Sequence, residues 1–363
     1  MGSADHAARA WIDVDLGALV HNARTIANRA RCPILPMIKA DGYGIGAVPA
    51  ARALDVLDPW GFGVATVAEG EELRRAGVER PIVVFTPLLD AELAPAAAAR
   101  LTPTLHRAAE ITAWARHALP WHLAIDTGMN RAGIPWTGVG ELLDAVRAHP
   151  PEGAFTHFHS AELADGSMEC QLARFDAAVA ALPARPRWVH AENSAAVQHA
   201  APSRFDLARP GVYLYGVGVP EFDAPPPRPV VALRARIVDL REAADGETVS
   251  YLQTYRAVGL RRIATVAVGY GDGYPRALGN RGWADVRGRR APVAGLVTMD
   301  MTMLDVTNIP CGVGDSVTLI GGDGDVAPDV PTLARLADTS PYEVLTRLRG
   351  RLPRRHAHAE RDS

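Results

Sequence analysis

The chain has 363 residues, of which 48% are hydrophobic and 22% charged, and its net charge is −3. That length suits two domains, and that composition is typical of a soluble globular enzyme. The charge balance predicts no nucleic-acid partner, and the lack of a long apolar run predicts neither a membrane span nor a signal peptide. We therefore expect a cytoplasmic protein.

The cysteines stand far apart, at Cys32, Cys170 and Cys311. They form no CxxC pair, so their spacing predicts no disulfide, and we expect no metal site. Small buried thiols of this kind suit a reducing compartment.

Short apolar runs alternate with helical patterns over the first two-thirds of the chain. One helical stripe is clear, with Met168, Phe175 and Leu182 among its apolar positions. Eight such units in about 215 residues predict a (β/α)₈ barrel, with a doubly wound open sheet as the alternative. The expected strands are 34–39, 61–66, 81–86, 101–105, 121–126, 153–159, 187–193 and 205–211.

A second domain of different character is predicted after a proline-rich stretch at 218–231. Its β-like runs are separated by Gly, Asp and Pro rather than by helices. We therefore expect an α/β plus all-β chain, with a TIM-like barrel at 10–225 and a mostly β domain at 230–355. A strand near residues 10–16 is assigned to the second domain.

Polar side chains recur where the predicted barrel strands end, which is where barrel enzymes carry their chemistry. Lys39, the only lysine in the chain, ends the first strand, and Ser194 and Gly211 follow the seventh and eighth. Loops at the last two strands commonly bind phosphate. A lysine amine beside a phosphate site suggests a Schiff base with pyridoxal phosphate, although a lone lysine in a glycine-rich loop is also compatible with a solvated surface residue.

The motifs in this order and spacing resemble those of the alanine racemase family, pyridoxal phosphate enzymes with a barrel and a β domain. The resemblance covers nearly the whole chain. The motifs are WIDVDLGAL from Trp11, IKADGYG around Lys39, DTGMNRAG around Arg131, THF at His157, VHAENSAA at His190, LARPGVYLYG at Arg209, VSYLQTY at Ser250, VGYGDGYPR at Tyr270 and TMDMTMLDVT around Met299.

The resemblance implies a racemase that uses two bases, one on each face of the substrate Cα. Lys39 would be the Schiff-base lysine and one base. Tyr270 would be the other, supplied by the partner subunit of a homodimer with shared active sites. A phenol with a pKa of about 10 needs cationic help, which the family supplies through a histidine, here His157.

The resemblance also assigns the remaining site residues. Arg131 would bind the cofactor phenolate and the substrate carboxylate, since its fork donates several hydrogen bonds in fixed geometry. Arg209 would face the pyridine nitrogen and keep it unprotonated, because a guanidinium holds its proton, and this should suppress transamination. The other cofactor residues would be Tyr43, His190, Ser194, Gly211 and Val212, and Met299 and Asp300 would line the substrate pocket.

Three departures from the family pattern concern the substrate and Arg131. Ala124 replaces a modified lysine that holds the arginine in many members, so we expect an anion such as chloride, or water, in its place. Leu296 replaces an arginine near the active-site mouth. Gly350 replaces a tyrosine before the final R-x-P-R, which leaves a wider pocket or a substitute residue as alternatives.

Other functions stay open from the sequence. The first choice is interconversion of L- and D-alanine, with serine or a larger amino acid as alternative substrates. A decarboxylase of the same fold would carry a carboxylate where Arg209 stands. A non-catalytic pyridoxal phosphate carrier would resemble the barrel alone.

Overall fold

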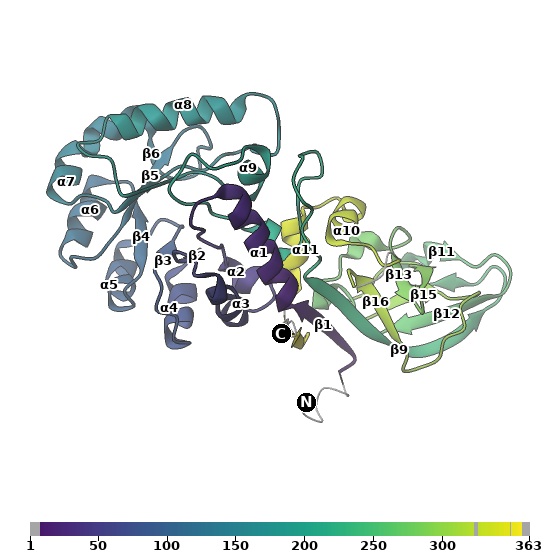
Figure 1. The fold of residues 1–363 in the computed structure, drawn as a ribbon. Helices are drawn as coiled ribbons and strands as arrows, with labels where there is room; N and C mark the ends of the chain where they lie inside the picture. Colours follow the sequence, from purple (N-terminus) through teal and green to yellow (C-terminus); the bar gives the residue numbers. More distant parts are fainter. Residues whose placement is uncertain (1–7, 323–325, 349, 358–363) are drawn as a thin grey trace, which may run out of the picture.

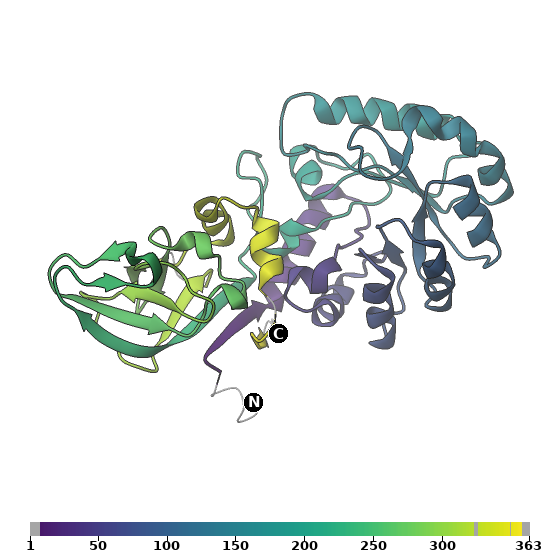
Figure 2. The same ribbon diagram turned by 180° about the vertical axis from the view of Figure 1, so that it is seen from behind.

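The computed structural model describes residues 8–322, 326–348 and 350–357. It has two lobes, a barrel coloured purple to teal and a β domain coloured green (Figure 1). The view from behind shows the same division, with the yellow helix α11 (Pro341–Arg347) between the lobes (Figure 2).

The barrel has six neighbouring parallel strands. A short strand, β6 (Ile134–Pro135), pairs with the end of β5 outside this order. Their runs are short and buried, as expected for strands covered by helices. The six, in sheet order, are β2 (Phe62–Val64), β3 (Ile82–Val84), β4 (Thr102–Leu105), β5 (His122–Asp126), β7 (Gly153–Phe155) and β8 (Trp188–His190).

The ring closes through the segments at 34–38 and 206–210. Isolated parallel bridges join Met37 to Gly63 on one side and Ile34 to Ala208 on the other. On the far side of the last segment, the Asp206 amide donates to the Val189 carbonyl over 3.0 Å. The eight predicted strands thus correspond to six regular strands and these two bridged segments, and the (β/α)₈ barrel is confirmed. The open-sheet alternative is wrong, because the first strand is paired along both of its edges.

Helices cover the outside of this ring (Figure 1). In α8, Met168 and Phe175 are buried, as the predicted apolar stripe requires. The helices are α1 (Leu16–Ala30), α2 (Lys39–Tyr43), α3 (Ala47–Leu54), α4 (Val67–Arg75), α5 (Asp90–Ala98), α6 (Ala108–Ala115), α7 (Leu143–Ala148), α8 (Ser167–Ala180) and α9 (Ser194–His199), with 3₁₀ turns η2 (Asp55–Leu57), η3 (Trp136–Leu142) and η4 (Val212–Tyr215).

The second lobe is mostly β, as predicted. Its strands are β1 (Ala10–Asp15), β9 (Val231–Ala243), β10 (Thr248–Val249), β11 (Tyr255–Arg256), β12 (Arg261–Val266), β13 (Trp283–Val286), β14 (Arg289–Pro292), β15 (Thr302–Asp305), β16 (Ser316–Ile320) and β17 (Arg354–Ala357). The other elements are α10 (Val330–Ala337), α11, η5 (Tyr251–Gln253), η6 (Tyr270–Asp272) and η7 (Arg276–Leu278). The two ends of the described chain meet here, because β1 pairs with β9 antiparallel and with β17 parallel.

Helix α11 packs against turns from both lobes. A Cβ on Gly44, just after α2, would lie 2.5 Å from the Leu345 carbonyl oxygen. A Cβ on Gly273, just after η6, would lie 2.2 Å from the Arg347 carbonyl oxygen. Both glycines also have positive φ, +91° and +98°, so no other residue fits these approaches without strain. Among the described residues, no helix is long and apolar enough to cross a membrane.

Candidate active site

A cavity of about 480 Å³ lies at the carboxyl ends of the barrel strands. Each of the six strands and the two closing segments contributes to its wall with a residue at its end or in the loop that follows. These residues are Lys39, Ala65, Thr86, His106, Arg131, His157, Ser194 and Gly211. Apolar and polar groups thus converge on one concave site, which is the usual form of a small-molecule pocket.

Lys39 begins a turn of unusual handedness. The next three residues, Ala40, Asp41 and Gly42, have φ values of 55°, 55° and 59°. A left-handed conformation is costly for alanine and aspartate, so other contacts must hold it. The Asp41 carboxylate accepts from the Ala47 amide over 2.9 Å, and Glu69 accepts from the Ala40 amide over 2.7 Å.

Sequence reasoning missed the role of Glu69. Its Oε1 accepts from Ala40, and its Oε2 accepts from the Ala65 amide at the end of β2 over 2.7 Å. It also forms a capping box with Thr66 at the start of α4. The Thr-x-x-Glu spacing was visible, but spacing alone indicates only a helix cap. The contact with Ala40 depends on how the first two barrel strands pack.

Burial lowers the pKa of the Lys39 amine, and the nearby Arg131 and Arg209 charges lower it further, while Glu69 opposes them. A lower pKa leaves more of the amine neutral at working pH. A neutral, desolvated amine is a nucleophile and a base.

Arg209 is the most deeply buried charged group at the floor of the cavity, with 3% of its surface exposed. Its Nη2 donates to the carbonyls of Thr156 and Ala191 over 2.7 and 2.9 Å. The guanidinium also lies over the rings of Phe85 and Phe155, with centroid distances of 5.7 and 5.3 Å. Burial lowers its pKa to about 9, so the group stays protonated at neutral pH.

Two histidines face Arg209 from opposite sides. His190 Nδ1 lies 2.8 Å from Arg209 Nη1, and His157 Nδ1 lies 3.3 Å from Nη2. A guanidinium can only donate, so both Nδ1 atoms are acceptors and both ring protons sit on Nε2. His190 is thus in contact with Arg209 but is not among the described residues that line the cavity.

His157 is neutral rather than cationic. Burial, followed by the charges of Arg209, Arg131 and Lys39, lowers its pKa to about 3. The lowered pKa disfavours the positive charge expected of this histidine, whose role stays a prediction. The charge resides on Arg209, and His157 offers a polarised Nε2–H donor in front of it.

Ser194, Gly211 and Tyr43 form a small uncharged cradle. The Ser194 hydroxyl accepts from the amides of Gly211 and Tyr213 over 2.8 and 3.3 Å. A Cβ on Gly211 would lie 2.6 Å from the Tyr43 hydroxyl, so only glycine admits this approach. Val212 follows as the first residue of η4 and lines the cavity too. Hydroxyls and backbone amides around a glycine suit a phosphate group.

Arg131 lies at the rim of the cavity and is exposed. Ala124, in β5, lines the same cavity and is buried. Within the ranges that the structure describes, no carboxylate lies at ion-pair distance from Arg131. An anion or water beside Arg131 stays a prediction.

Two family models together match nearly the whole chain. The model described as alanine racemase, N-terminal domain, matches residues 14–219, and that described as alanine racemase, C-terminal domain, matches 230–356. The alanine racemase of Deinococcus radiodurans is 39% identical over 353 residues, covering 96% of this chain and 99% of that protein. The chain belongs to the alanine racemase family.

Solved structures of family members have the same fold. Alanine racemase from Streptomyces coelicolor A3(2) superposes with a TM-score of 0.90 at 31% identity, covering 98% of this chain and 99% of that one. Alanine racemase from Bartonella henselae, solved with covalently bound pyridoxal phosphate, gives 0.89 at 28% identity, covering 96% and 100%. These likenesses confirm the family resemblance read from the motifs.

The family's second-domain motifs lie away from the cavity of their own chain. Tyr270, Met299 and Asp300 are not among the described residues that line it. Tyr270 is 42% exposed and lines a separate hollow with Arg276. One chain therefore gathers the barrel residues of the predicted site but leaves the second-domain residues on its surface.

A tyrosine that sequence reasoning overlooked lines the cavity. Tyr342, in the first turn of α11, lines the cavity, and its ring centroid lies 6.2 Å from that of Tyr43. Gly350 is not on the cavity, and a Cβ there would meet no atom within 4 Å. The glycine therefore does not widen this pocket. Of the two alternatives, the presence of Tyr342 favours a substitute residue, and both stay predictions.

Proposed function

We propose that this chain is a pyridoxal phosphate-dependent alanine racemase whose active sites each use two subunits. The observation that carries the proposal is the arrangement around Lys39. Its amine shares one cavity with the Ser194–Gly211 cradle and with Arg209, while the motif tyrosine Tyr270 faces outward in the same chain.

The residues present fit the cofactor. Tyr43, Ser194, Gly211 and Val212 would hold its phosphate by hydroxyls and backbone N–H groups. Gly211 supports this fit directly, because a Cβ there would fill the cradle. Lys39 would anchor the aldehyde. When bound, the cofactor acidifies the Cα–H of the amino acid attached to it and accepts the electron pair.

Arg209 sets the chemistry by what it cannot do. It has no acceptor atom and keeps its proton, so beside the ring nitrogen of the cofactor it would leave that nitrogen unprotonated. This would favour return of the proton to Cα over transamination. The decarboxylase alternative, which requires a carboxylate in this place, is not favoured.

Two bases exchange the proton. Lys39 Nζ takes or returns it on one face of Cα, helped by its lowered pKa. Tyr270 of the partner subunit does so on the other face, and His157 Nε2–H would donate to its oxygen and stabilise the phenolate. Arg131 would hold the substrate carboxylate. Met299 and Asp300 would reach the same pocket with Tyr270 in a head-to-tail homodimer.

We place the enzyme in the cytoplasm. The three cysteines are unpaired, which is compatible with a reducing compartment. The preferred substrate is alanine, because Tyr342 restricts the cavity beside Tyr43.

The activity is tested by adding L-alanine, and then a panel of other L-amino acids, to purified protein with pyridoxal phosphate and measuring the D-enantiomer by chiral chromatography. D-alanine should form fastest. Lys39→Arg should abolish both turnover and the visible absorption of the bound cofactor, because a guanidinium cannot replace the amine. Failure to racemise any amino acid would refute the proposal.

The shared site is tested by mixing two inactive variants. Lys39→Arg and Tyr270→Phe each remove one base from every site of a homodimer. Mixed dimers regain one complete site, with Lys39 from one subunit and Tyr270 from the other. Random exchange should therefore restore about a quarter of the wild-type activity. If both bases came from one chain, mixing would restore nothing.

A further inference from the structure

We propose that Arg351 is the positioning residue for the second base. This role for Arg351 rests on the proposed function, in which Tyr270 acts in the partner's cavity. Arg351 ties the turn that carries Tyr270 to the turn that carries Met299 and Asp300, and so presents both to the partner as one rigid surface.

The two turns already touch through the backbone. The Tyr270 amide donates to the Thr298 carbonyl, and the Gly271 amide donates to the Met299 carbonyl, each over 2.9 Å. Within the first turn, Asp272 Oδ2 accepts from the Gly269 amide over 2.9 Å. These bonds fix the backbone of the two turns, whereas the Tyr270 side chain is 42% exposed.

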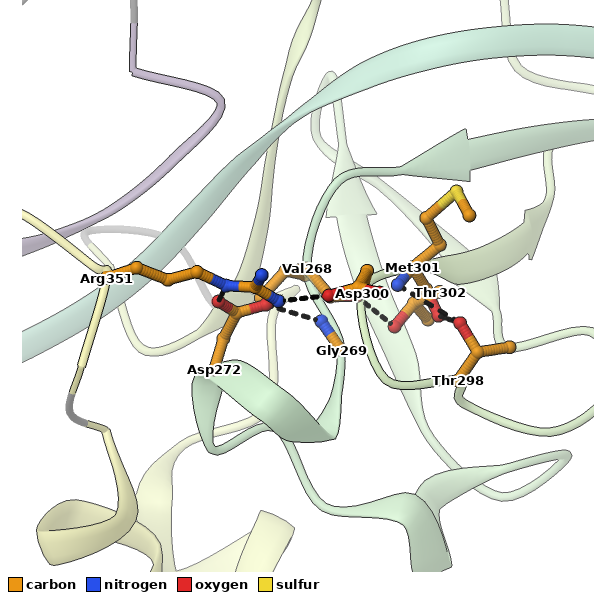
Figure 3. Close-up of polar contacts among 8 residues, drawn as sticks. All are labelled: Val268, Gly269, Asp272, Thr298, Asp300, Met301, Thr302 and Arg351. Atoms are coloured by element: carbon orange, nitrogen blue, oxygen red, sulfur yellow. Dashed lines mark hydrogen bonds and ion pairs between the residues drawn. The ribbon is translucent and has the colours of Figure 1, made fainter.

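Arg351 joins the turns through their side chains. Its Nε lies 2.7 Å from Asp272 Oδ1, and its Nη2 pairs with Asp300 Oδ1 (Figure 3). Asp272 is 4% exposed, whereas the side chains of Arg351 and Asp300 are 59% and 52% exposed. The bridge therefore has one buried anchor and one outer end. A planar guanidinium can hold two carboxylates at once in fixed geometry, which a lysine amine cannot.

This geometry matters for a base that must meet its substrate across a subunit boundary. A displacement of about 1 Å can cost a hundredfold in rate. Tyr270 and Met299 lie on adjoining exposed turns, so loss of the bridge would leave only the two backbone hydrogen bonds to hold the turns together. Residues such as these need a supporting shell to stay in position.

Arg351 also neutralises a buried carboxylate close to the base. Asp272 is two residues from Tyr270, and without Arg351 its charge would be buried and unpaired. An uncompensated anion so close disfavours formation of a phenolate on Tyr270. The other charged or titratable groups around this turn are Arg276, Arg347, Tyr274 and Asp300.

The test compares Arg351→Gln with Arg147→Gln in the cofactor-loaded protein. Arg147 is a matched control, since its side chain is 58% exposed and, within the described part of the chain, pairs with Asp144 alone. Arg351→Gln should lower kcat by about tenfold or more with little change in KM for alanine. The visible absorption of the cofactor should stay unchanged. In the profile of kcat against pH, the part that depends on Tyr270 should move to higher pH. Arg351→Lys can hold one carboxylate, so its kcat should lie between that of the wild type and that of Arg351→Gln.

A second measurement does not depend on catalysis. Hydrogen exchange at the amides of residues 269–273 should be faster in Arg351→Gln, with or without cofactor, and unchanged in Arg147→Gln. Wild-type kcat, pH profile and exchange in Arg351→Gln would overturn the inference. If the wild-type protein itself does not racemise alanine, the proposed function fails, and the exchange result still decides whether Arg351 holds the turn.

Discussion

Arg209 donates a hydrogen bond from Nη1 to Nδ1 of His190 over 2.8 Å. His190 Nε2 in turn lies 2.9 Å from Nδ1 of His122, which is fully buried. Because the arginine can only donate, each ring in this chain is fixed in one neutral tautomer, with its proton on Nε2. The last of these protons, on His122, has no hydrogen-bond partner among the described residues.

The buried histidines should make stability depend on pH. Burial, then Arg209, lowers the pKa of His122 and of His157 to about 3, and that of His190 goes well below its usual value. Below pH 6.5 the unfolded chain therefore binds protons that the folded chain does not. The free energy of unfolding should fall as pH drops from 6.5 toward 3, by up to about 1.4 kcal/mol per pH unit for each histidine.

Urea unfolding at pH 7, 6 and 5 measures this slope. His122→Gln should make it shallower, and replacement of the exposed His117 by glutamine should not. An identical slope in wild type and His122→Gln would show that His122 is charged in the folded state.

Gly211→Ala should weaken cofactor binding. The added Cβ would lie 2.6 Å from the Tyr43 hydroxyl, which is held from behind by a stacked Tyr215 ring 4.4 Å away. Overpacking of this kind costs about 1–3 kcal/mol, so the Kd for pyridoxal phosphate should rise about tenfold or more. Gly140→Ala is the control, because a Cβ there meets nothing within 4 Å. Equal affinity for pyridoxal phosphate in both variants would contradict the assignment of Gly211 to the phosphate-binding cradle.

Tyr342→Ala should broaden the substrate range. Loss of the phenol enlarges the cavity beside Tyr43, so kcat/KM for serine relative to alanine should rise about tenfold. Gly350→Asn tests the alternative position with a residue that tolerates its φ of +74°. That variant should keep the wild-type ratio. A change of ratio at Gly350 but not at Tyr342 would reverse the assignment.

Halide should support substrate binding through Arg131. Replacing chloride by gluconate at constant ionic strength should raise KM for alanine about threefold, because no described carboxylate holds the guanidinium. Ala124→Glu places a carboxylate on the same cavity wall and should remove the dependence. If the KM of the wild type for alanine does not change with chloride, the group beside Arg131 is water rather than a halide.

The sequence by itself determined the barrel and the family. Eight apolar runs at regular spacing were enough to place the strands, because a parallel strand covered by helices must be apolar on both faces. The single lysine, Lys39, indicated its chemistry, because arginine can take every other basic role in the chain but cannot form a Schiff base.

Only the tertiary structure decided which side chains meet. Glu69 supports the turn after Lys39, Tyr342 lines the cavity, and Arg351 joins Asp272 to Asp300. The hydrogen-bonded pairs among these residues lie up to 79 residues apart in the chain. Apolar periodicity reports which face of an element is buried, but the partner of a polar side chain depends on how whole elements pack, and that packing has no local signature in the sequence.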